Sequence, residues 1–364
     1  MAKIRVVLAD DSSLARAMLR SFLEDDGNIE VVGEATNGVE AVRLAVELKP
    51  DLVTMDLEMP VMSGMDAITE IMATRAVPIL VVSSVADAQK ACAAVAHGAL
   101  DVINKPELDV AAGAAFVAKV KMLANIRVIT HIRSRFSEKS TTEVSGSISP
   151  ASSFSTPPVN TVLQHSDGDK LSRVFAIASS TGGPQALATI LGQLPADFPC
   201  PLLISQHIAD GFASGMAEWL AGVCKLPVRL AREGELIMPG TVYISPSEAN
   251  LSVSPSRRIA LAQRLLGEIY HPTCDVLLAS VAAVYGYLGV GIILTGMGSD
   301  GAAGIAEIHK TGGATLAQDE ASSVIFGMNK VAIERGGVQQ ILPADEIPQA
   351  MCRLAGLIVR GELP

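Results

Sequence analysis

Three acidic residues follow predicted strands in the first third of this chain. Asp10 and Asp11 end a β-branched run over residues 4–10, and Asp56 ends another over residues 51–56. Because parallel strands present their carboxyl ends at one edge of a sheet, we expect the three carboxylates to lie close together. Clustered carboxylates repel one another unless a cation sits among them, and oxygen ligands without Cys or His suit Mg²⁺. The pattern therefore predicts a magnesium site.

A hydroxyl and an ammonium group belong to the same predicted edge. Ser83 ends the next strand, and Lys105 ends the last strand of this half. A carboxylate such as Asp56 can attack phosphorus to form an acyl phosphate, while Mg²⁺ and Lys105 neutralise the phosphoryl oxygens. Any one of the acids could simply cap a helix, as aspartate often does. Five polar strand ends together favour phosphoryl acceptance.

A second group of reactive side chains lies in the second half. Residues 179–184 read Ser-Ser-Thr-Gly-Gly-Pro and lead from a buried strand into a helix. Free N–H groups at such a helix N-terminus favour negative charge, whether a bound phosphate or a developing oxyanion. The stretch has no P-loop lysine and no G-x-G-x-x-G pattern, so a nucleotide site is the weaker alternative.

An imidazole and a carboxylate complete a possible catalytic set. His207 follows the next strand, and Asp300 lies in the glycine-rich turn after a third strand. Each alone would have a structural explanation, but three strand ends that offer a hydroxyl, an imidazole and a carboxylate suit a nucleophilic hydrolase. His207 would accept the serine proton and return it to the leaving group, while Asp300 orients the ring. The order Ser, His, Asp matches none of the three familiar triad orders, no G-x-S-x-G elbow is present, and spacing does not choose between Ser179 and Ser180.

The elements that must position these side chains alternate short strands with longer helical stretches, which indicates parallel sheets flanked by helices. A stretch rich in Ser, Thr and Pro over residues 137–158 separates two such regions and has the composition of a linker. We find no internal repeat. The strands are expected at 4–10, 30–34, 51–56, 78–83, 101–105, 174–180, 201–206, 241–245, 290–294 and 314–318, and the helices of the first half at 13–24, 38–48, 64–73, 87–97 and 109–126.

Composition sets further bounds. The 364 residues exceed the usual length of one domain, about 100 to 200 residues, and an apolar fraction of 49% supports buried cores. A net charge of −10 without a basic stripe disfavours nucleic-acid and membrane-surface partners, so a DNA-binding output is the least favoured class. Five scattered cysteines without a C-x-x-C pair suggest neither a disulfide framework nor a zinc site. The absence of a long apolar run and of a signal peptide predicts a cytoplasmic protein.

The first half resembles the receiver domain of two-component response regulators. The resemblance rests on Asp10-Asp11, Asp56 within Met-Asp-Leu-Glu-Met-Pro, Ser83 and Lys105-Pro106. It implies a flavodoxin-like (βα)5 fold over residues 1–124, phosphorylation at Asp56 by a histidine kinase, and Mg²⁺ held by Asp11, Asp56 and the carbonyl of Glu58, beside the Asp10 carboxylate of the predicted magnesium site. Val102 departs from the family, in which many members carry an aromatic ring there, so the switch here is expected to work without that ring.

The second half resembles the CheB family of chemotaxis protein-glutamate methylesterases. The matching residues are Ser180 to Pro184, Gln206-His207, Tyr243 to Pro246, Pro272 with Asp275 to Leu277, Leu294 to Gly301, Leu316 to Asp319, Phe326 to Met328 and Gly336 to Val338. The resemblance implies a Rossmann-like catalytic domain over residues 172–364, joined to the receiver through residues 125–171. In that family the serine before Thr-Gly-Gly is the nucleophile, which selects Ser180, with His207 as base and Asp300 as orienting acid.

The same resemblance implies an oxyanion region at Thr181, Gly182 and Met297 and no cofactor in the catalytic domain. This sequence departs from the family at Ala178 and Ser179, where the family commonly has Gly and Ala, and at Thr273-Cys274, where Ser-Val is common. The implied activity is hydrolysis of glutamyl methyl esters on methyl-accepting chemoreceptors, with deamidation of glutamines. The resemblance also implies that the protein does not insert directly into the membrane. Both reactions would serve adaptation in chemotaxis signalling.

The receiver and linker predict regulation by docking. The linker would keep the receiver docked on the catalytic domain about 90% of the time, where it covers the sheet edge that carries the active site. Phosphorylation of Asp56 would weaken this docking. The fragment 172–364 should then outperform the unphosphorylated full-length protein. Two other interpretations remain at this point: a receiver with a noncatalytic nucleotide- or partner-binding output domain, and an esterase acting on a peptide or small-molecule ester.

Overall fold

The structure is a computed structural model that describes residues 2–106, 110–126, 128, 173–264 and 270–357. It contains two parallel sheets with helices on both faces, as the sequence predicts, and the fold class is confirmed. The predicted linker over residues 137–158 lies outside the described residues, and the domain boundaries at 124 and 172 stay predictions.

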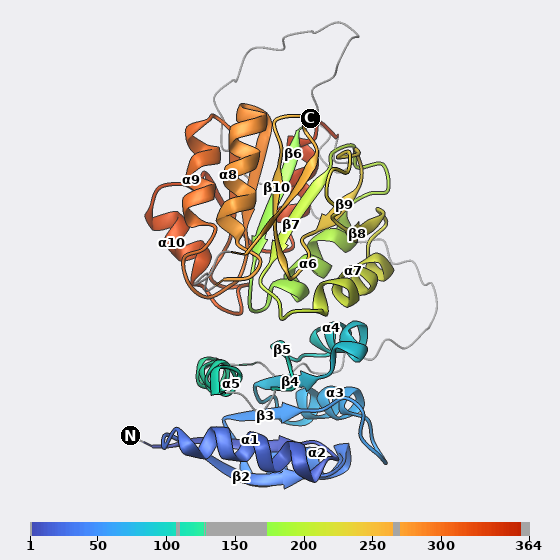
Figure 1. The fold of residues 1–364 in the computed structure, drawn as a ribbon, viewed down its shortest axis with the longest axis vertical. Coiled ribbons are helices and arrows are strands. Elements are labelled where there is room, and N and C mark those ends of the chain that lie inside the picture. The colour runs from blue at the N-terminus through green and yellow to red at the C-terminus, as the bar shows by residue number, and fades with distance from the viewer. Residues whose placement is uncertain (1, 107–109, 127, 129–172, 265–269, 358–364) are drawn as a thin grey trace, which may run out of the picture. The chain divides into compact units, whose positions relative to one another are not determined.

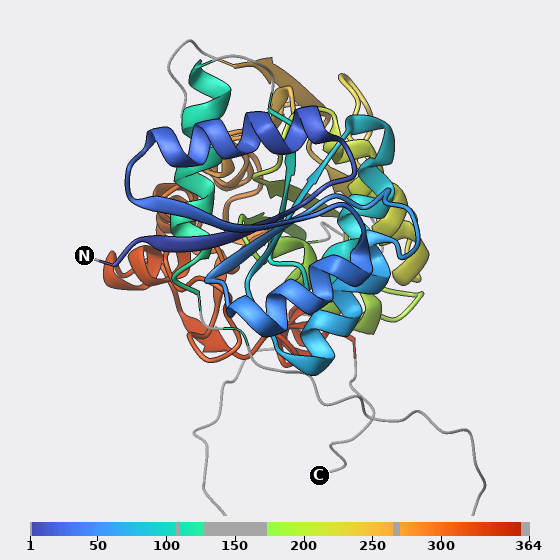
Figure 2. The same cartoon turned by 90° about the horizontal axis from the view of Figure 1, so that it is seen from below.

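The first domain is a five-stranded parallel sheet in the order β2-β1-β3-β4-β5. Its elements are β1 (Ile4–Ala9), α1 (Ser13–Asp25), β2 (Ile29–Ala35), α2 (Gly38–Leu48), β3 (Leu52–Met55), α3 (Gly64–Thr74), β4 (Ile79–Ser83), η1 (Val85–Asp87), α4 (Ala88–Ala96), β5 (Asp101–Asn104) and α5 (Val110–Leu123). Alternate strand residues point to opposite faces. Leu8 therefore packs with residues of α1 and α5, whereas Val7 packs with residues of α2, α3 and α4. Figure 2 shows these two groups of helices on opposite faces of the sheet.

The second domain is a seven-stranded parallel sheet in the order β14-β13-β12-β6-β7-β9-β8, with a separate antiparallel pair β10-β11. Its elements are β6 (Val174–Ser179), α6 (Gly183–Gln193), β7 (Leu202–Gln206), α7 (Phe212–Val223), β8 (Val228–Leu230), β9 (Val242–Ile244), β10 (Ala249–Val253), β11 (Ile259–Gln263), α8 (Cys274–Tyr285), η2 (Gly286–Leu288), β12 (Gly289–Ile293), α9 (Ala302–Lys310), β13 (Ala314–Gln318), α10 (Met328–Glu334), β14 (Gln340–Leu342) and α11 (Ile347–Leu354).

Two apolar cores fix the position of this second sheet. Phe175 and Ile177 of β6 pack with side chains of α6, α7 and α11 on one face. Ala176 and Ala178 pack on the other face with α8, α9 and α10, which lie side by side in Figure 1, and with the β10-β11 pair. The small alanines let this second layer approach the sheet closely.

The order β12-β6-β7 places three strand ends next to one another. Ala178 of β6 is in register with Ile293 of β12 and with Ser205 of β7. Ser180, His207 and the turn that begins at Leu294 therefore leave the sheet at the same carboxyl edge. This is where ligands bind in open α/β sheets.

The ten predicted strands and the five predicted helices of the first half are all present, with ends shifted by at most a few residues. Three strand regions were not predicted: β8, the β10-β11 pair and β14. β8 and β14 have three residues each and none of them is buried, and β11 has one buried residue of five.

Candidate active site

Ser180 stands in the tight turn between β6 and α6. Its amide donates to the carbonyl of Thr295 at 3.0 Å, and its carbonyl accepts the amide of Gly183 at 2.7 Å. Gly182 has φ +78°, and a Cβ there would meet Val324 at 2.6 Å. A Cβ at Gly296 would lie 2.6 Å from the Cβ of Ser180. Glycine at these two positions therefore allows the turn and the close approach of the β12 loop to the serine.

The two neighbouring serines have different surroundings. Ser179 is fully buried and its hydroxyl donates to Oε1 of Gln206 at 2.6 Å. The Gln206 amide nitrogen in turn donates to the carbonyl of Ser180 at 2.8 Å. The hydroxyl of Ser180 forms no hydrogen bond with any residue that the structure describes. This difference favours Ser180 as the reactive hydroxyl and gives Ser179 a packing role.

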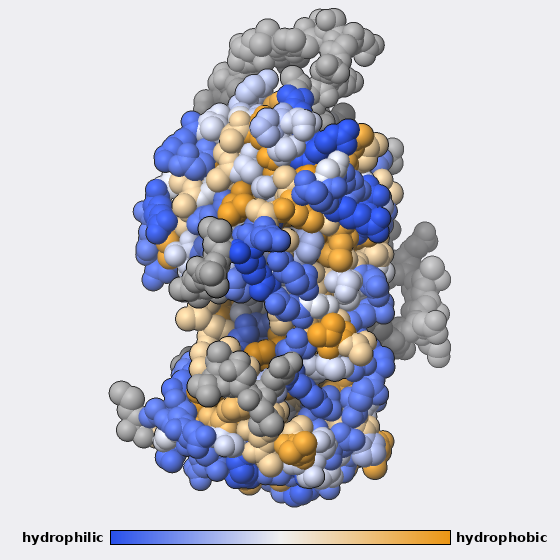
Figure 3. Space-filling model, in the orientation of Figure 1, coloured by the Kyte–Doolittle hydropathy of each residue, from blue (hydrophilic) through white to orange (hydrophobic). Residues whose placement is uncertain are grey.

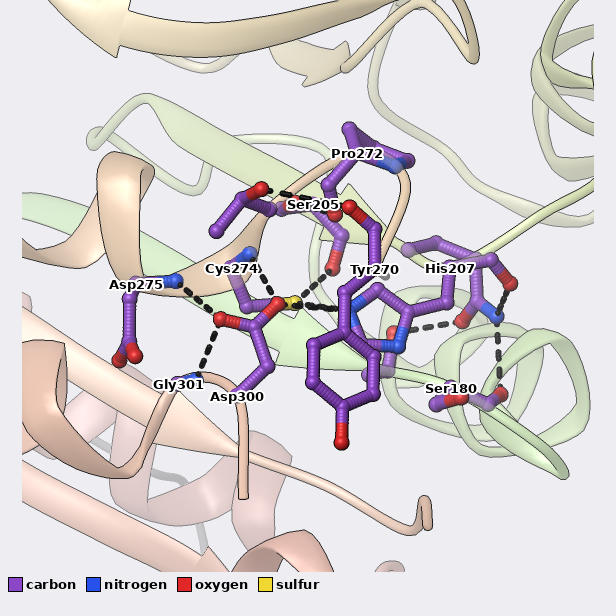
Figure 4. A network of polar contacts seen from close by, with 12 residues as sticks. Ser180, Ser205, His207, Tyr270, Pro272, Cys274, Asp275, Asp300 and Gly301 are labelled. Carbon is purple, nitrogen blue, oxygen red and sulfur yellow. Dashed lines mark hydrogen bonds and ion pairs between the residues drawn. The ribbon is translucent and has the colours of Figure 1, made fainter. Parts of the chain in front are cut away.

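His207 and Asp300 form a close pair at the same edge. The Nε2 atom of His207 lies 2.7 Å from Oδ2 of Asp300 (Figure 4). The His207 amide also donates to the carbonyl of Ser179 at 2.9 Å, which ties the histidine backbone to the end of β6. With Nε2 held by the carboxylate, Nδ1 is the ring nitrogen left to accept a proton. Within the described residues, no direct hydrogen bond joins the Ser180 hydroxyl to the His207 ring.

Backbone amides hold the Asp300 carboxylate in place. Its Oδ2 accepts from the amide of Cys274 at 2.7 Å, and its Oδ1 accepts from the amides of Asp275 and Gly301, each at 3.0 Å. Cys274 and Asp275 are the first two residues of α8, so the carboxylate caps the N-terminus of that helix from another loop. Figure 4 shows this network between Asp300, the α8 terminus and His207.

The electrostatic balance keeps Asp300 ionised. Burial raises its pKa, but the hydrogen bond and charge of His207 and the amides of Cys274 and Asp275 outweigh burial and hold the pKa below its ordinary value. The neighbouring Asp275 differs: burial, with a smaller contribution from the charge of Asp300, raises its pKa. A carboxylate that stays charged beside imidazole stabilises the ring when it accepts a proton.

Backbone donors near Ser180 suit a developing oxyanion. The amides of Thr181, Gly182 and Met297 donate to no acceptor in the described part of the chain. Thr181 is buried, with its carbonyl accepting the hydroxyl of Thr295 at 3.0 Å, whereas the side chain of Met297 is 53% exposed. The predicted oxyanion residues therefore lie in the two turns that border Ser180, and their amides are available to donate hydrogen bonds to an oxyanion.

The acidic residues of the first domain also converge. Carboxylate oxygens of Asp10, Asp11 and Asp56 lie within 4.8 Å of one another. The ammonium of Lys105 is 2.9 Å from Oδ2 of Asp10 and 2.9 Å from Oδ2 of Asp56. The hydroxyl of Ser83 is buried without a hydrogen-bond partner. An all-oxygen cluster of this kind fits Mg²⁺, and the unpartnered hydroxyl beside it fits a phosphoryl oxygen.

The pKa values of Asp56 and Lys105 reflect both their burial and the charges around them. Burial raises the pKa of Asp56, and the charge of Asp10 adds to the increase, while Lys105 opposes it. For Lys105, burial lowers the pKa, but the two carboxylates outweigh burial and raise it. Lys105 is thus the main group that opposes the rise in the pKa of the aspartate at the end of β3.

Comparison with known proteins supports the family resemblance of each half of the chain. The family model of the CheB methylesterase matches residues 175–351, and that of the response regulator receiver domain matches residues 6–112. The protein-glutamate methylesterase/protein-glutamine glutaminase 3 of Paramagnetospirillum magneticum is 52% identical over 358 residues, which cover 98% of both chains. The chain belongs to the CheB methylesterase family.

Two more distant proteins are also similar to this chain. The protein-glutamate methylesterase/protein-glutamine glutaminase of Pyrococcus abyssi is 34% identical and covers 99% of this chain and 95% of its own. The crystal structure of the CheB methylesterase catalytic domain of Thermotoga maritima is 35% identical, with a TM-score of 0.49, over 50% of this chain and 98% of its own.

Two residues expected from the family have surroundings that sequence alone did not give. The carboxylate of Glu58 is paired with Lys90, so its predicted metal role stays with its main-chain carbonyl, as a prediction. Val102 lies half-buried in β5. Its part in the switch also stays a prediction.

No site role was predicted from the sequence for three neighbours of the pair formed by His207 and Asp300. Tyr270 stacks on His207 with ring centroids 5.1 Å apart and an interplanar angle of 14°. Gln206 links Ser179 to Ser180, and the thiol of Cys274 lies 3.5 Å from Nε2 of His207. The sequence did mark two of them, since Gln206 matches the family beside His207 and Cys274 departs from it. Nothing in the sequence singled out Tyr270.

No helix among the described residues is long and apolar enough to cross a membrane. On the face drawn in Figure 3, hydrophilic and hydrophobic residues are interspersed.

Proposed function

We propose that this chain is a phosphorylation-activated protein-glutamate methylesterase that hydrolyses glutamyl methyl esters on methyl-accepting chemoreceptors. The observation that carries the proposal is the 2.7 Å pair of His207 and Asp300 beside the turn of Ser180, in a chain of the CheB family. The placement is cytoplasmic, where a histidine kinase and the signalling helices of receptors are both accessible. The receiver with a noncatalytic output domain is not favoured by this family membership.

The first half-reaction transfers the acyl group to the serine. The Ser180 oxygen attacks the ester carbonyl carbon while its proton passes to Nδ1 of His207. The negative charge that develops on the carbonyl oxygen meets the free amides of Thr181, Gly182 and Met297, and loss of one such donor typically costs about 10²–10³ in rate. The carbon–oxygen bond of the ester then breaks, and methanol leaves with the proton from His207.

The second half-reaction returns the enzyme to its starting state. A water molecule gives one proton to His207 and attacks the acyl carbon, and the bond to Ser180 breaks as the serine oxygen regains that proton. The product is a free glutamate side chain. A glutamine side chain would follow the same route with ammonia as the leaving group. Asp300 stays ionised throughout and stabilises the charged imidazole.

The receiver supplies control through Asp56. Mg²⁺, when bound by Asp10, Asp11, Asp56 and the Glu58 carbonyl, would neutralise charge during phosphoryl transfer from a histidine kinase. Lys105 and Ser83 contribute an ammonium and a hydroxyl to the phosphoryl oxygens. Phosphorylation would then release inhibition of the esterase, as expected from the sequence.

The test is methanol release from a methylated chemoreceptor by full-length protein, with and without a small-molecule phosphodonor. We expect the phosphodonor to increase the rate in the wild type but not in Asp56→Asn, and Ser180→Ala to abolish it. Release from unrelated esters at the same rate would favour the alternative substrate class. Methanol release by Ser180→Ala at the wild-type rate would contradict the proposal.

A further inference from the structure

The thiol of Cys274 adds a third metal-binding group to the catalytic pair. Ligand atoms of His207, Cys274 and Asp300 all lie within 4.8 Å of one another. They come from the end of β7, the first residue of α8 and the loop after β12. Because the three residues are far apart in the sequence, the cysteine spacing that usually reveals a zinc site is absent.

One of the two known distances already suits a tetrahedral ion, and the other requires a small movement. Zinc–sulfur and zinc–nitrogen bonds of about 2.3 and 2.0–2.1 Å place the two ligand atoms about 3.5 Å apart at a tetrahedral angle. The sulfur of Cys274 lies 3.5 Å from Nε2 of His207. Nε2 and Oδ2 of Asp300 are 2.7 Å apart and would have to separate by about 0.6 Å, since the tetrahedral spacing is about 3.3 Å.

The surroundings hold two of these ligands in place. Asp275 and Gly301 fix the carboxylate of Asp300 through their amides, and Tyr270 stacks on the His207 ring. Outer contacts of this kind orient the ligands in metal sites. One imidazole, one thiolate and one carboxylate form a donor set that favours Zn²⁺ over Mg²⁺, and three protein ligands leave a fourth position open.

We propose that His207, Cys274 and Asp300 form an inhibitory site for Zn²⁺ within the catalytic centre. Binding replaces the thiol proton of Cys274 by a sulfur–zinc bond, and that proton leaves to solvent. Nε2 of His207 binds zinc through its lone pair, so the ring proton moves from Nε2 to Nδ1. A protonated Nδ1 cannot accept the proton of Ser180, and the pair between His207 and Asp300 is broken.

The inhibitory effect rests on the proposed function, but metal binding does not. The binding test therefore uses Co²⁺ as a spectroscopic probe on full-length protein, with excess Mg²⁺ present to occupy the acidic cluster of the receiver. We expect one equivalent of Co²⁺ to produce a thiolate-to-cobalt charge-transfer band in the wild type. Cys274→Ala should lose the band, and its affinity for Zn²⁺, measured by competition with a chelating dye, should fall on the order of 100-fold.

Two further variants serve as controls. Cys200→Ala also removes a buried thiol from this domain, and it should retain the band and the zinc affinity of the wild type. Cys274→Val introduces the residue that the family commonly has at this position, so it serves if the alanine variant does not fold, and it should behave like Cys274→Ala. Circular dichroism and the thermal midpoint establish that each variant is folded.

The activity test measures methanol release against Zn²⁺ concentration. Zinc should inhibit the wild type and Cys200→Ala reversibly, with recovery on addition of a chelator, and the concentration for half inhibition should rise on the order of 100-fold in Cys274→Val. Equal inhibition of that variant, or a folded wild type without the cobalt band, would overturn the site. A cobalt band in a protein without esterase activity would instead support the site and contradict the proposed function.

Discussion

The two sheet edges carry reactive groups at equivalent places but balance their charges in opposite ways. At the edge of the first sheet, burial and the charge of Asp10 raise the pKa of Asp56, with one lysine opposing them. At the edge of the second, burial raises the pKa of Asp300, but His207 and the α8 amides outweigh burial and lower it. The surroundings of the first carboxylate thus suit a cation and a phosphoryl group, as proposed, and those of the second suit an imidazole.

The difference comes from the backbone rather than from the strands. Asp300 receives three amide hydrogen bonds from the N-terminus of α8 and from Gly301. Asp56 receives one, from Leu57 at 2.8 Å. A helix terminus can therefore stabilise a permanent negative charge, whereas the acidic cluster remains dependent on a counterion.

The largest expected effect is the loss of the nucleophile. Ser180→Ala should lower methanol release by at least about 10⁴-fold, because removal of a catalytic serine eliminates the covalent route. The matched control is Ser179→Ala, which leaves Oε1 of Gln206 without its buried donor. That variant should lose about 1–3 kcal/mol of stability in denaturant unfolding while it still turns over. The opposite pattern between the two serines would contradict the assignment.

The next effect concerns the imidazole. Asp300→Asn should lower kcat by about 10²–10⁴-fold, because the neutral amide no longer stabilises the protonated ring. The substrate KM should change far less, since Asp300 is buried and does not contact substrate in this account. Steady-state kinetics on a methylated receptor separates the two parameters. A change confined to KM would assign Asp300 to substrate binding instead.

A smaller effect tests regulation. The fragment 172–364 should release methanol about tenfold faster than the unphosphorylated full-length protein, as expected for an active edge covered about 90% of the time. The phosphodonor should then increase the rate of the full-length protein only. If the fragment is equally slow, occlusion by the receiver is wrong.

The smallest expected effect is on the free energy of unfolding, to which Asp56 and Asp300 should contribute with opposite dependence on pH. The folded pKa of Asp56 is raised, so stability falls as pH rises from its ordinary pKa of 3.8 through the folded value. Asp56→Asn should therefore stabilise the Mg²⁺-free protein at neutral pH by no more than about 1 kcal/mol, because the variant also loses the charge that pairs with Lys105. For Asp300 the folded pKa is lowered, so its stabilisation is present above 3.8 and lost as pH falls below it.

Denaturant unfolding as a function of pH measures both contributions. Mg²⁺ should stabilise the wild type more than Asp56→Asn, because one of the ligands is lost in the variant. A destabilised Asp56→Asn at neutral pH would show that Lys105 more than compensates for the clustered charges.

Most of the site residues that the sequence could predict lie at the ends of strands. Alternation of β-branched runs with helical stretches was sufficient to place Asp10, Asp56, Ser180 and His207 at sheet edges, since the carboxyl ends of parallel strands coincide. The choice of Ser180 over Ser179 needed the family resemblance, and the structure supplies a physical reason in the hydrogen bond between Ser179 and Gln206.

Contacts between distant loops could not be predicted in the same way. The amides of α8 reach Asp300, and Tyr270 reaches His207, only because the loops after β12 and before α8 fold over the sheet edge. The periodicity of apolar residues gives no information about such contacts between loops. The short strands β8 and β14 could not be predicted because they lack the buried apolar run that identifies a strand. The same limitation hid Cys274, which became significant only through its position beside the ring.

The central claim is that the Ser180 oxygen becomes acylated with help from His207. Acid quenching of the enzyme during turnover of a methylated receptor helix, followed by digestion and mass spectrometry, tests it directly. The account predicts a glutamyl adduct on Ser180 in the wild type and none in His207→Ala. An adduct on another residue, with Ser180 unmodified in protein that releases methanol, would contradict it.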